Sequence, residues 1–275
     1  MDLKNFYPQR NSWSHKGNFG YVLIVAGGRI CSGSPAFNAL GALRAGADLT
    51  MIISHPRAAE IAAGFAPDLI TRPLDKDLEM KHVGKIVSLA KKFDSLVIGG
   101  GLARNEKTYK AIKEIIKAVD LPMVIDAEAI RAVAEEPKIL ENKKAILTPH
   151  SEEFKVLTAE EIKPEVEDRK EKNKKWAEKL KTTILLKGHI DVISDGKEVI
   201  LNETGSSLMT KGGTGDILAG ICAAFLARKF SLLESAEAAA FINGKAGEMA
   251  ALKYAEGLLA GNLFEFIPEV IKKYK

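Results

Sequence analysis

The chain has 275 residues, of which 46% are hydrophobic and 28% are charged. This composition provides enough apolar material for a sizeable core and excludes disordered and fibrous proteins. Lysine and arginine outnumber aspartate and glutamate by 40 to 36, and this mild, evenly spread excess of positive charge does not indicate nucleic-acid binding.

Buried strands alternate with helical segments along most of the chain. Short apolar runs rich in β-branched residues predict strands at 21–26, 48–53, 95–98, 122–125, 145–147 and 183–186. Helical periodicity lies between them, at about 34–45, 79–92, 105–119, 127–135 and 165–181. Parallel strands need crossover connections, and helices then cover both faces of the sheet. The pattern predicts an α/β fold, a three-layer α/β/α sandwich with a mostly parallel central sheet.

The C-terminal half adds three features to this alternation. Strands near 190–194 and 198–201 flank Asp195-Gly196, a pair typical of a hairpin turn. From residue 213 onward the pattern is helical. The densest charge run, 160–181, alternates signs at helical spacing and indicates a solvated helix with Trp176 and Leu180 as its buried stripe. No linker or internal repeat interrupts the chain, so we expect residues 1–275 to form a single domain.

The cysteines and the N-terminus bear on the cellular compartment. Cys31 and Cys222 are too few for a disulfide framework and lack metal-ligand spacing, so we expect a reducing environment and two small side chains in or near the core. The first residues do not form a signal sequence, and no apolar run approaches the roughly 18 residues of a membrane span. We therefore expect a cytoplasmic protein that does not contact membranes.

Residues 204–227, TGSSLMTKGGTGDILAGICAAFLA, carry the most informative functional signal. Here Gly212, Gly213 and Gly215 precede a continuous helix-forming run. Free backbone N–H groups at such a turn, together with the positive end of the helix dipole, form a site for anionic oxygens. We expect the N–H groups of Gly213, Thr214 and Gly215 to act as an anion hole for a phosphoryl group in transfer.

Asp216 follows these glycines, where a carboxylate would repel a bound phosphate. It is either a simple helix cap or a catalytic group that aligns an attacking hydroxyl in phosphoryl transfer, and we favour catalysis. We expect the helix end to keep the pKa of Asp216 low. The segment is not a P-loop, and GGGLAR at 99–104 is an incomplete dinucleotide fingerprint, with Asp126 readily explained as a turn residue.

Seven blocks of sequence resemble the NAD(P)H-hydrate dehydratase family, a branch of the ribokinase-like superfamily. The blocks are HKGNFGYVLIVAGG (15–28), SGSPAFNALGALRAGADLT (32–50), LVIGGGLAR (96–104), MVIDAEAI (123–130), ILTPHSEEF (146–154), LLKGHIDVI (185–193) and KGGTGDILAGI (211–221). The last two blocks indicate the superfamily, and the first five single out the dehydratase. The resemblance covers nearly the whole chain and implies a ribokinase-like fold.

The resemblance implies removal of water from the hydrated nicotinamide ring of NADH or NADPH. A nucleotide phosphorylates the ring hydroxyl, and phosphate then departs as a far better leaving group than hydroxide. Stand-alone archaeal and bacterial members suggest ADP as the phosphoryl donor, whereas eukaryotic members use ATP. Mg²⁺ is expected because it would neutralise the donor phosphates. The family also implies a homo-oligomer, expected to be a tetramer.

The resemblance also implies roles for individual residues. Asp216 matches the catalytic aspartate and contacts the substrate, and Gly215 lies against the nucleotide. A nucleotide-contacting loop is matched by Lys187, Gly188, His189, Ile190 and Asp191. Positions lining the hydrated dinucleotide are matched by Gly33, Ser34, Gly101 and His150. Glu153 matches a glutamate that in related kinases organises magnesium and phosphate indirectly.

Structural explanations stand beside these roles. Lys187-Gly188 also fits a strand end with a turn, although a lysine there is well placed as a point charge for phosphates, which we favour. His150 fits a helix cap equally well, and Glu153 fits the first turn of a helix through the dipole. We expect the loop at 15–20 to lie near the first strand, with its glycines shaping the backbone.

The chain departs from the family pattern at several positions. Members typically have Gly-Pro-Gly-Leu-Gly where this chain has 99–103, Asp where Glu128 stands and Gly where Glu152 stands; residues 206–208 replace an Asn-Pro-Gly turn. Ala103 and Glu128 are small changes. Glu152 matters more, because its Cβ and charge are expected to alter pocket shape or phosphate affinity.

Three other functions stay open on the sequence. An ATP-dependent kinase for a small alcohol, such as a thiazole, pyrimidine or sugar, would keep Asp216 and the glycines but release a stable phosphoester. A non-catalytic nucleotide sensor would keep the binding residues without turnover. A hydride-transfer enzyme is disfavoured by the incomplete fingerprint.

Overall fold

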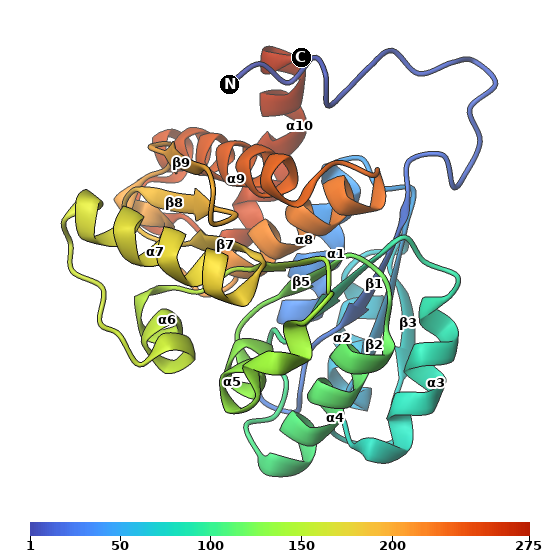
Figure 1. Ribbon diagram of the computed structural model, residues 1–275. Helices are drawn as coiled ribbons and strands as arrows, with labels where there is room; N and C mark the ends of the chain where they lie inside the picture. The colour runs from blue at the N-terminus through green and yellow to red at the C-terminus, as the bar shows by residue number, and fades with distance from the viewer.

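The computed structural model describes residues 1–275, and a nine-stranded sheet forms its centre (Figure 1). The strand order is β3-β2-β1-β4-β5-β6-β7-β8-β9. The strands are β1 (Tyr21–Val25), β2 (Leu49–Ser54), β3 (Ile70–Pro73), β4 (Ser95–Ile98), β5 (Met123–Ile125), β6 (Ala145–Leu147), β7 (Thr183–Leu186), β8 (Asp191–Ser194) and β9 (Val199–Asn202). Strands β1 to β7 are parallel, whereas β8 and β9 form an antiparallel hairpin. The carboxyl ends of β1 to β7 therefore share one edge of the sheet.

Helices cover both faces of this sheet. They are α1 (Ser34–Arg44), α2 (Pro56–Phe65), α3 (Met80–Ala90), α4 (Glu106–Ala118), α5 (Glu128–Glu135), α6 (Ser151–Thr158), α7 (Val166–Leu180), α8 (Thr214–Ala227), α9 (Leu232–Tyr254) and α10 (Leu263–Tyr274). The core under α3 to α7 lies on one face, and the core under α1, α2 and α8 to α10 lies on the other. None of these helices combines the length and the apolar character needed to cross a membrane.

Side-chain alternation along the strands supplies both cores. On β1, Val22 and Ile24 belong to the core under α1 and α8, whereas Leu23 and Val25 belong to the core under α3 and α4. All four are fully buried, because successive side chains of a strand point to opposite faces and each face is covered by helices. The expected three-layer α/β/α sandwich, the mostly parallel sheet and the hairpin at 195–196 are confirmed.

Two elements are absent from the sequence prediction. Strand β3 lies at the edge of the sheet and ends in Arg72-Pro73, so it lacks the apolar run that marks a buried strand. Helix α2 begins at Pro56 and buries only alanines, which give weak periodicity. His55 Nδ1 accepts the Arg57 N–H at 3.2 Å and caps this helix.

Helix α7 buries more than its apolar stripe. Trp176 and Leu180 are each 8% exposed, as predicted. Arg169 and Asn173 lie on the same side and are also buried, which the alternating charges concealed. Asn173 Nδ2 donates to the carbonyl oxygens of Ile184 and Val192 at 3.1 and 2.8 Å, so a polar side chain ties α7 to β7 and β8.

The two cysteines occupy different environments. Cys222 is buried in α8, as expected, and burial raises the pKa of its thiol. Cys31 is exposed, so the expectation that it lies in or near the core was wrong. The physical reason is that Cys31 belongs to the loop between β1 and α1, which crosses the carboxyl edge of the sheet instead of entering it. A Cβ at Gly101 would lie 2.7 Å from the Cys31 carbonyl oxygen, so this loop rests on the turn after β4.

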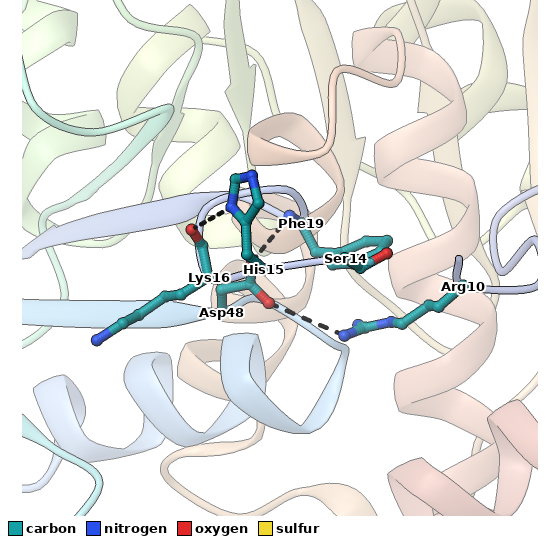
Figure 2. Close-up of a pocket in the computed structure, with 6 residues that line it drawn as sticks. All are labelled: Arg10, Ser14, His15, Lys16, Phe19 and Asp48. Atoms are coloured by element: carbon teal, nitrogen blue, oxygen red, sulfur yellow. Dashed lines mark hydrogen bonds and ion pairs between the residues drawn. The ribbon is translucent and has the colours of Figure 1, made fainter. Parts of the chain in front are cut away.

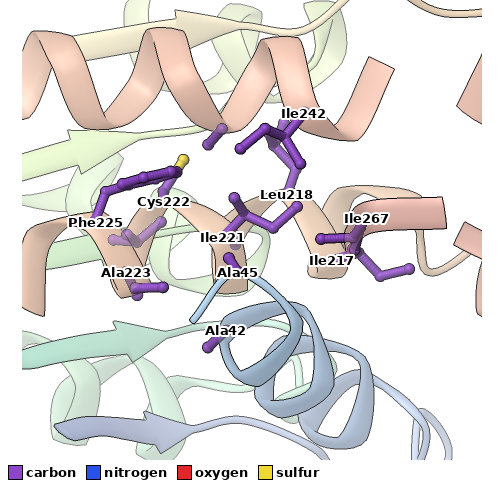
Figure 3. Packing of buried hydrophobic residues seen from close by; sticks show 14 of the residues in the cluster. Ala42, Ala45, Ile217, Leu218, Ile221, Cys222, Ala223, Phe225, Ile242 and Ile267 are labelled. Atoms are coloured by element: carbon purple, nitrogen blue, oxygen red, sulfur yellow. The ribbon is translucent and has the colours of Figure 1, made fainter. Parts of the chain in front are cut away.

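Helices α1 and α8 pack at backbone distance. A Cβ at Gly220 would lie 2.0 Å from the Asn38 carbonyl oxygen, and one at Gly41 would lie 2.7 Å from the Ile217 carbonyl oxygen. From Ile217 to Ala227 every residue of α8 is buried, and Figure 3 shows its apolar side chains between α1 and the neighbouring helices. Helix α8 is therefore held in one position in the core.

Gly220→Ala is expected to destabilise the protein by about 3 kcal/mol or more, because the added methyl group must push α1 and α8 apart. Thermal or denaturant unfolding measures this loss. Gly84→Ala is the matched control, since a Cβ in the middle of α3 meets nothing within 4 Å and should stabilise by about 0.5–1 kcal/mol. Equal effects of the two substitutions would contradict the close approach of the helices.

Candidate active site

The predicted site residues gather at the carboxyl edge of the sheet. Loops after β4, β5, β6 and β7 carry Gly100, Asp126, His150 and Lys187, respectively. The first turn of α8 brings Asp216 to the same edge, because a Cβ at Gly100 would lie 2.4 Å from Asp216 Oδ1. Parallel strands place their following loops together in this way.

Asp216 is held between α1 and the turn after β4. Asn38 Nδ2 donates to the main-chain oxygen of Asp216 at 2.7 Å. The Ser34 Cβ lies 3.5 Å from the position of a Cβ at Gly100, so Ser34 and Asp216 both pack against this turn. The Asp216 residue is half-buried, and its Oδ1 lies against the Gly100 turn, so the carboxylate lies at the edge of the sheet and not in the apolar core.

The pKa of Asp216 is raised from its ordinary value of 3.8 to about 7. Burial is the largest cause, and the negative charge of Asp126 adds to it, while Ser34 and Lys187 oppose the rise. The expectation of a low pKa was therefore wrong, because burial and a neighbouring carboxylate outweigh the positive end of α8. A carboxylate that titrates near neutrality is well matched to accepting a proton from a hydroxyl.

Lys187 connects the acidic residues of this edge. Its Nζ lies 3.1 Å from Asp126 Oδ1 and 3.7 Å from Glu153 Oε2. The same Nζ would lie 3.3 Å from a Cβ at Gly215, so the ammonium group faces the first turn of α8. Burial alone would lower the pKa of Lys187, but the charges of Asp126 and Glu153 raise it above its usual value. Lys187 is thus a fixed positive charge beside Gly215.

The first turn of α8 presents free amide groups. Gly213, at φ 106°, sets the left-handed turn before the helix, and a Cβ there would lie 2.6 Å from Phe37 Cε2. The N–H groups of Gly213, Gly215 and Asp216 have no acceptor in the chain. The Thr214 N–H makes only a 3.4 Å bond to the Lys211 carbonyl. Three free donors and the helix dipole at one place suit anionic oxygens.

The loop from Lys187 to Asp191 is shaped by its own aspartate. Asp191 Oδ1 accepts the Gly188 N–H at 2.9 Å, and Oδ2 accepts Asn202 Nδ2 at 3.0 Å. Burial raises the pKa of Asp191. Gly188 and His189 are exposed, and Ile190 is half-buried. The side chain of Asp191 therefore closes the loop, which leaves its backbone and His189 open to a ligand.

Arg169 supports this loop from α7. Its Nη2 donates to the carbonyl oxygens of Leu186 and Lys187 at 3.2 and 3.0 Å. A Cβ at Gly188 would lie 2.4 Å from the same Nη2. Burial lowers the pKa of Arg169. The guanidinium group thus fixes the position from which the Lys187 side chain extends.

His150 and Glu153 form a capping box at the start of α6. His150 Nδ1 accepts the N–H groups of Glu152 and Glu153 at 3.2 and 3.3 Å, and Glu153 Oε2 accepts the His150 N–H at 2.9 Å. The structural explanations of both residues are thereby confirmed. His150 is also exposed at the carboxyl edge, so a ligand role is compatible with the cap. Glu152 is exposed.

The glycines predicted to line the dinucleotide, Gly33 and Gly101, contact Phe37 and Ser34, respectively. A Cβ at Gly101 would lie 3.0 Å from Ser34 Oγ, and one at Gly33 would lie 3.5 Å from Phe37 Cε2. Phe37 also lies against Gly213. The structure therefore brings Gly33, Ser34 and Gly101 together with the first turn of α8.

Sequence reasoning missed two residues that touch this cluster. Asp126 is not merely a turn residue, because its Oδ1 accepts hydrogen bonds from Thr148 Oγ1 at 2.7 Å and from Lys187 Nζ at 3.1 Å. Its position directly after a buried strand was the available signal. Asn38 binds the Asp216 backbone from within α1, and no local pattern marks it.

Metal ligation by protein side chains alone is absent from this edge. No group of three His, Cys, Asp or Glu side chains is arranged to hold a metal ion anywhere in the chain. Asp126 and Glu153 both contact Lys187. Mg²⁺ commonly binds through one or two carboxylates together with substrate phosphates. The Glu153 side chain is only 9% exposed and its Oε2 already accepts the His150 N–H, so it fits an indirect role in such a site.

The loop at 15–20 lies at the opposite edge of the sheet, before β1. It borders a cavity of about 300 Å³ lined by Arg10, Ser14, His15, Lys16, Phe19 and Asp48 (Figure 2). Asp48 Oδ2 accepts the N–H groups of Gly17 and Phe19 at 2.8 and 2.9 Å. The expected position near the first strand is confirmed, and this cavity is separate from the cluster around Asp216.

The chain is similar to known proteins over nearly its whole length. The sequence model of the NAD(P)H-hydrate dehydratase family matches residues 22–269. An ADP-dependent (S)-NAD(P)H-hydrate dehydratase of Cenarchaeum symbiosum is 40% identical over 99% of this chain and 96% of its own length. The bifunctional NAD(P)H-hydrate repair enzyme Nnr of Pyrobaculum aerophilum is 42% identical over 96% of this chain, which spans about half (53%) of that relative.

A solved structure shows the same fold. The ADP/ATP-dependent NAD(P)H-hydrate dehydratase of Bacillus subtilis, co-crystallised with ATP and Mg²⁺, superimposes with a TM-score of 0.83 at 27% identity. The alignment covers 98% of this chain and 95% of that one. The likeness confirms the ribokinase-like fold that the sequence blocks implied.

Asp216→Asn is expected to stabilise the folded protein by about 2–4 kcal/mol at pH 8 or above. The folded-state pKa of about 7 lies above the ordinary 3.8, so the favourable contribution of the neutral carboxyl is complete below about pH 4 and is lost as the pH rises through 7. Unfolding free energies across this range measure the difference, which should vanish at the acid end. Asp120→Asn, at a side chain that is 99% exposed, is the control; a stability gain that does not depend on pH would contradict the raised pKa.

Proposed function

The chain belongs to the NAD(P)H-hydrate dehydratase family, and we propose that it is an ADP-dependent (S)-NAD(P)H-hydrate dehydratase. We also propose that residues 1–275 act as one domain in this activity. One observation carries the proposal: the Asp216 carboxylate stands beside three unpaired amide groups at the start of α8, with the Lys187 ammonium facing the same turn. A proton acceptor next to donors for phosphoryl oxygens is the arrangement that phosphorylation of a hydroxyl requires.

The reaction proceeds in two steps in this proposal. Asp216 takes the proton of the ring hydroxyl while the hydroxyl oxygen forms a bond to the terminal phosphorus of ADP. The bond from this phosphorus to the AMP oxygen breaks. The N–H groups of Gly213 and Gly215, which have no acceptor in the chain, hold the phosphoryl oxygens in transfer, and the Thr214 N–H joins them by giving up its 3.4 Å bond to the Lys211 carbonyl. The ring nitrogen then donates its electron pair, phosphate leaves with the C–O electrons, and loss of a ring proton restores the dihydropyridine of NAD(P)H.

The remaining site residues divide between the two ligands. We assign the loop of Lys187, Gly188, His189, Ile190 and Asp191 to the nucleotide, because its backbone is open and Lys187 faces Gly215. We assign Gly33, Ser34, Gly101 and His150 to the hydrated dinucleotide, because the first three gather with Phe37 beside the first turn of α8 and His150 is exposed at the same edge. Arg169 and Asp126 position Lys187 and need not touch either ligand.

Magnesium and donor choice follow from the same chemistry. Bound Mg²⁺ would supply positive charge to the donor phosphates, and Glu153 would take part indirectly. The similarity to an archaeal relative named as ADP-dependent supports ADP over ATP. Tetrameric assembly and a cytoplasmic location stay predictions from the sequence.

Asp216→Asn should lower turnover by at least about 10²–10⁴-fold, because the amide cannot accept the hydroxyl proton. The assay incubates hydrated NADH or NADPH with ADP or ATP and follows both the absorbance of the reduced nicotinamide and the release of inorganic phosphate. Nucleotide binding by the variant should persist. Asp120→Asn is the matched control with unchanged turnover.

Two outcomes of this assay would contradict the proposal. Accumulation of a stable phosphoester from a small alcohol, without recovery of NAD(P)H, would make the chain a small-molecule kinase. Full activity of the Asp216→Asn variant would remove Asp216 from the mechanism.

A further inference from the structure

A buried carboxylate, Glu128, organises a second charged group on the active edge. Arg104 donates to Glu128 Oε1 through Nε at 3.0 Å and through Nη2 at 2.7 Å. The Tyr109 hydroxyl donates to Oε2 at 2.5 Å, and Arg131 Nε lies 3.8 Å from Oε1. Both carboxylate oxygens are occupied, and two arginines beside one glutamate leave a net positive charge.

The Arg104 guanidinium group has one side exposed to solvent. Its side chain is 67% exposed, whereas that of Glu128 is only 12% exposed. Nη1 of Arg104 has no acceptor in the chain, because both of its hydrogen bonds use Nε and Nη2. The guanidinium group is thus fixed along one edge and open along the other.

Stability alone does not account for this arrangement. An exposed ion pair contributes little to folding, and a buried carboxylate carries a desolvation cost that its partners only offset. The Tyr109 hydroxyl and Arg131 already serve the carboxylate. An arginine held rigidly with a free edge is the usual form of a phosphate or carboxylate receptor.

The position of Arg104 relates it to Asp216. Gly100 lies against the Asp216 carboxylate. Arg104 follows four residues later, so the Cα atoms of Gly100 and Arg104 are at most about 14 Å apart. A dinucleotide with its nicotinamide end at Asp216 extends over a comparable distance and carries its phosphates away from the ring. A phosphate of a dinucleotide whose nicotinamide ring lies at Asp216 is therefore within reach of the Arg104 side chain.

We propose that Arg104 binds a phosphate group of the hydrated dinucleotide and that Glu128 and Tyr109 position its guanidinium. The inference rests on the proposed function, which supplies the dinucleotide. Two phosphate groups fit the chemistry: the pyrophosphate, which NADH and NADPH hydrates share, and the 2′-phosphate, which only the NADPH hydrate carries. A guanidinium edge offers two parallel N–H groups to either.

The test compares Arg104→Ala with the wild-type enzyme on both hydrated substrates. KM should rise about tenfold or more while kcat stays within about twofold, because the contact is remote from the reacting ring. A rise for NADPH hydrate alone identifies the 2′-phosphate, and a rise for both identifies the pyrophosphate. Unchanged KM for both substrates overturns the proposal.

Further variants separate phosphate binding from folding. Arg104→Ala combined with Glu128→Gln avoids a buried unpaired charge and should show the same rise in KM. Arg104→Lys keeps the charge but loses the planar fork, so it should recover only part of the affinity. Arg44→Ala removes an exposed arginine at the far end of α1 and is the control with unchanged KM.

A binding measurement keeps this inference distinct from the proposed function. Affinities for NADH and NADPH, measured by fluorescence or calorimetry, do not depend on turnover. If the wild-type chain dehydrates neither substrate, the proposed function has failed, yet weaker NAD(P)H binding by Arg104→Ala would still support the contact. Equal dinucleotide affinity of wild type and variant overturns it.

Discussion

The placement of Asp216 depends on how closely α1 approaches α8. Gly220 and Gly41 allow backbone atoms of the two helices to touch, and Asn38 then reaches the main-chain oxygen of Asp216. Because α8 is buried along most of its length, its first turn cannot shift without disturbing the core. The amide groups, the carboxylate and the Gly100 turn are therefore positioned by packing, and the chemistry at the sheet edge inherits that rigidity.

Acidic side chains outnumber basic ones at this edge of the sheet. Asp126, Glu153 and Asp216 face a single ammonium group, Lys187. A cluster with excess negative charge lowers its energy by keeping a proton on its least stabilised carboxylate, and here that carboxylate is Asp216. A phosphate bound at the amide groups would raise the proton affinity of Asp216 further unless a cation neutralises it. The carboxylate thus becomes a stronger base when a phosphoryl acceptor must lose its proton.

The parts of this picture that local sequence encodes could be predicted. The strands of the parallel sheet, the glycine turn and Asp216 depend on patterns within a few residues of each other. The pairing of Asp126 with Lys187 joins residues 61 positions apart, and Asn38 meets Asp216 across 178 positions, so no local pattern contains them. The predicted direction of the Asp216 pKa shift was wrong for the same reason. The helix dipole is local, whereas burial and the Asp126 charge arise from tertiary packing.

The residues that depart from the family pattern lie in different surroundings. Glu152, which is expected to alter pocket shape or phosphate affinity, is exposed next to His150 at the carboxyl edge, and this expectation stays a prediction. Glu128 looked minor as an exchange of one acid for another. It is buried and contacts both Arg104 and Tyr109, and an aspartate, one methylene shorter, would not span both partners in the same geometry. Glu128 therefore holds the Arg104 guanidinium in place at the turn after β4, and under the proposed phosphate contact this bears on ligand recognition more than on folding.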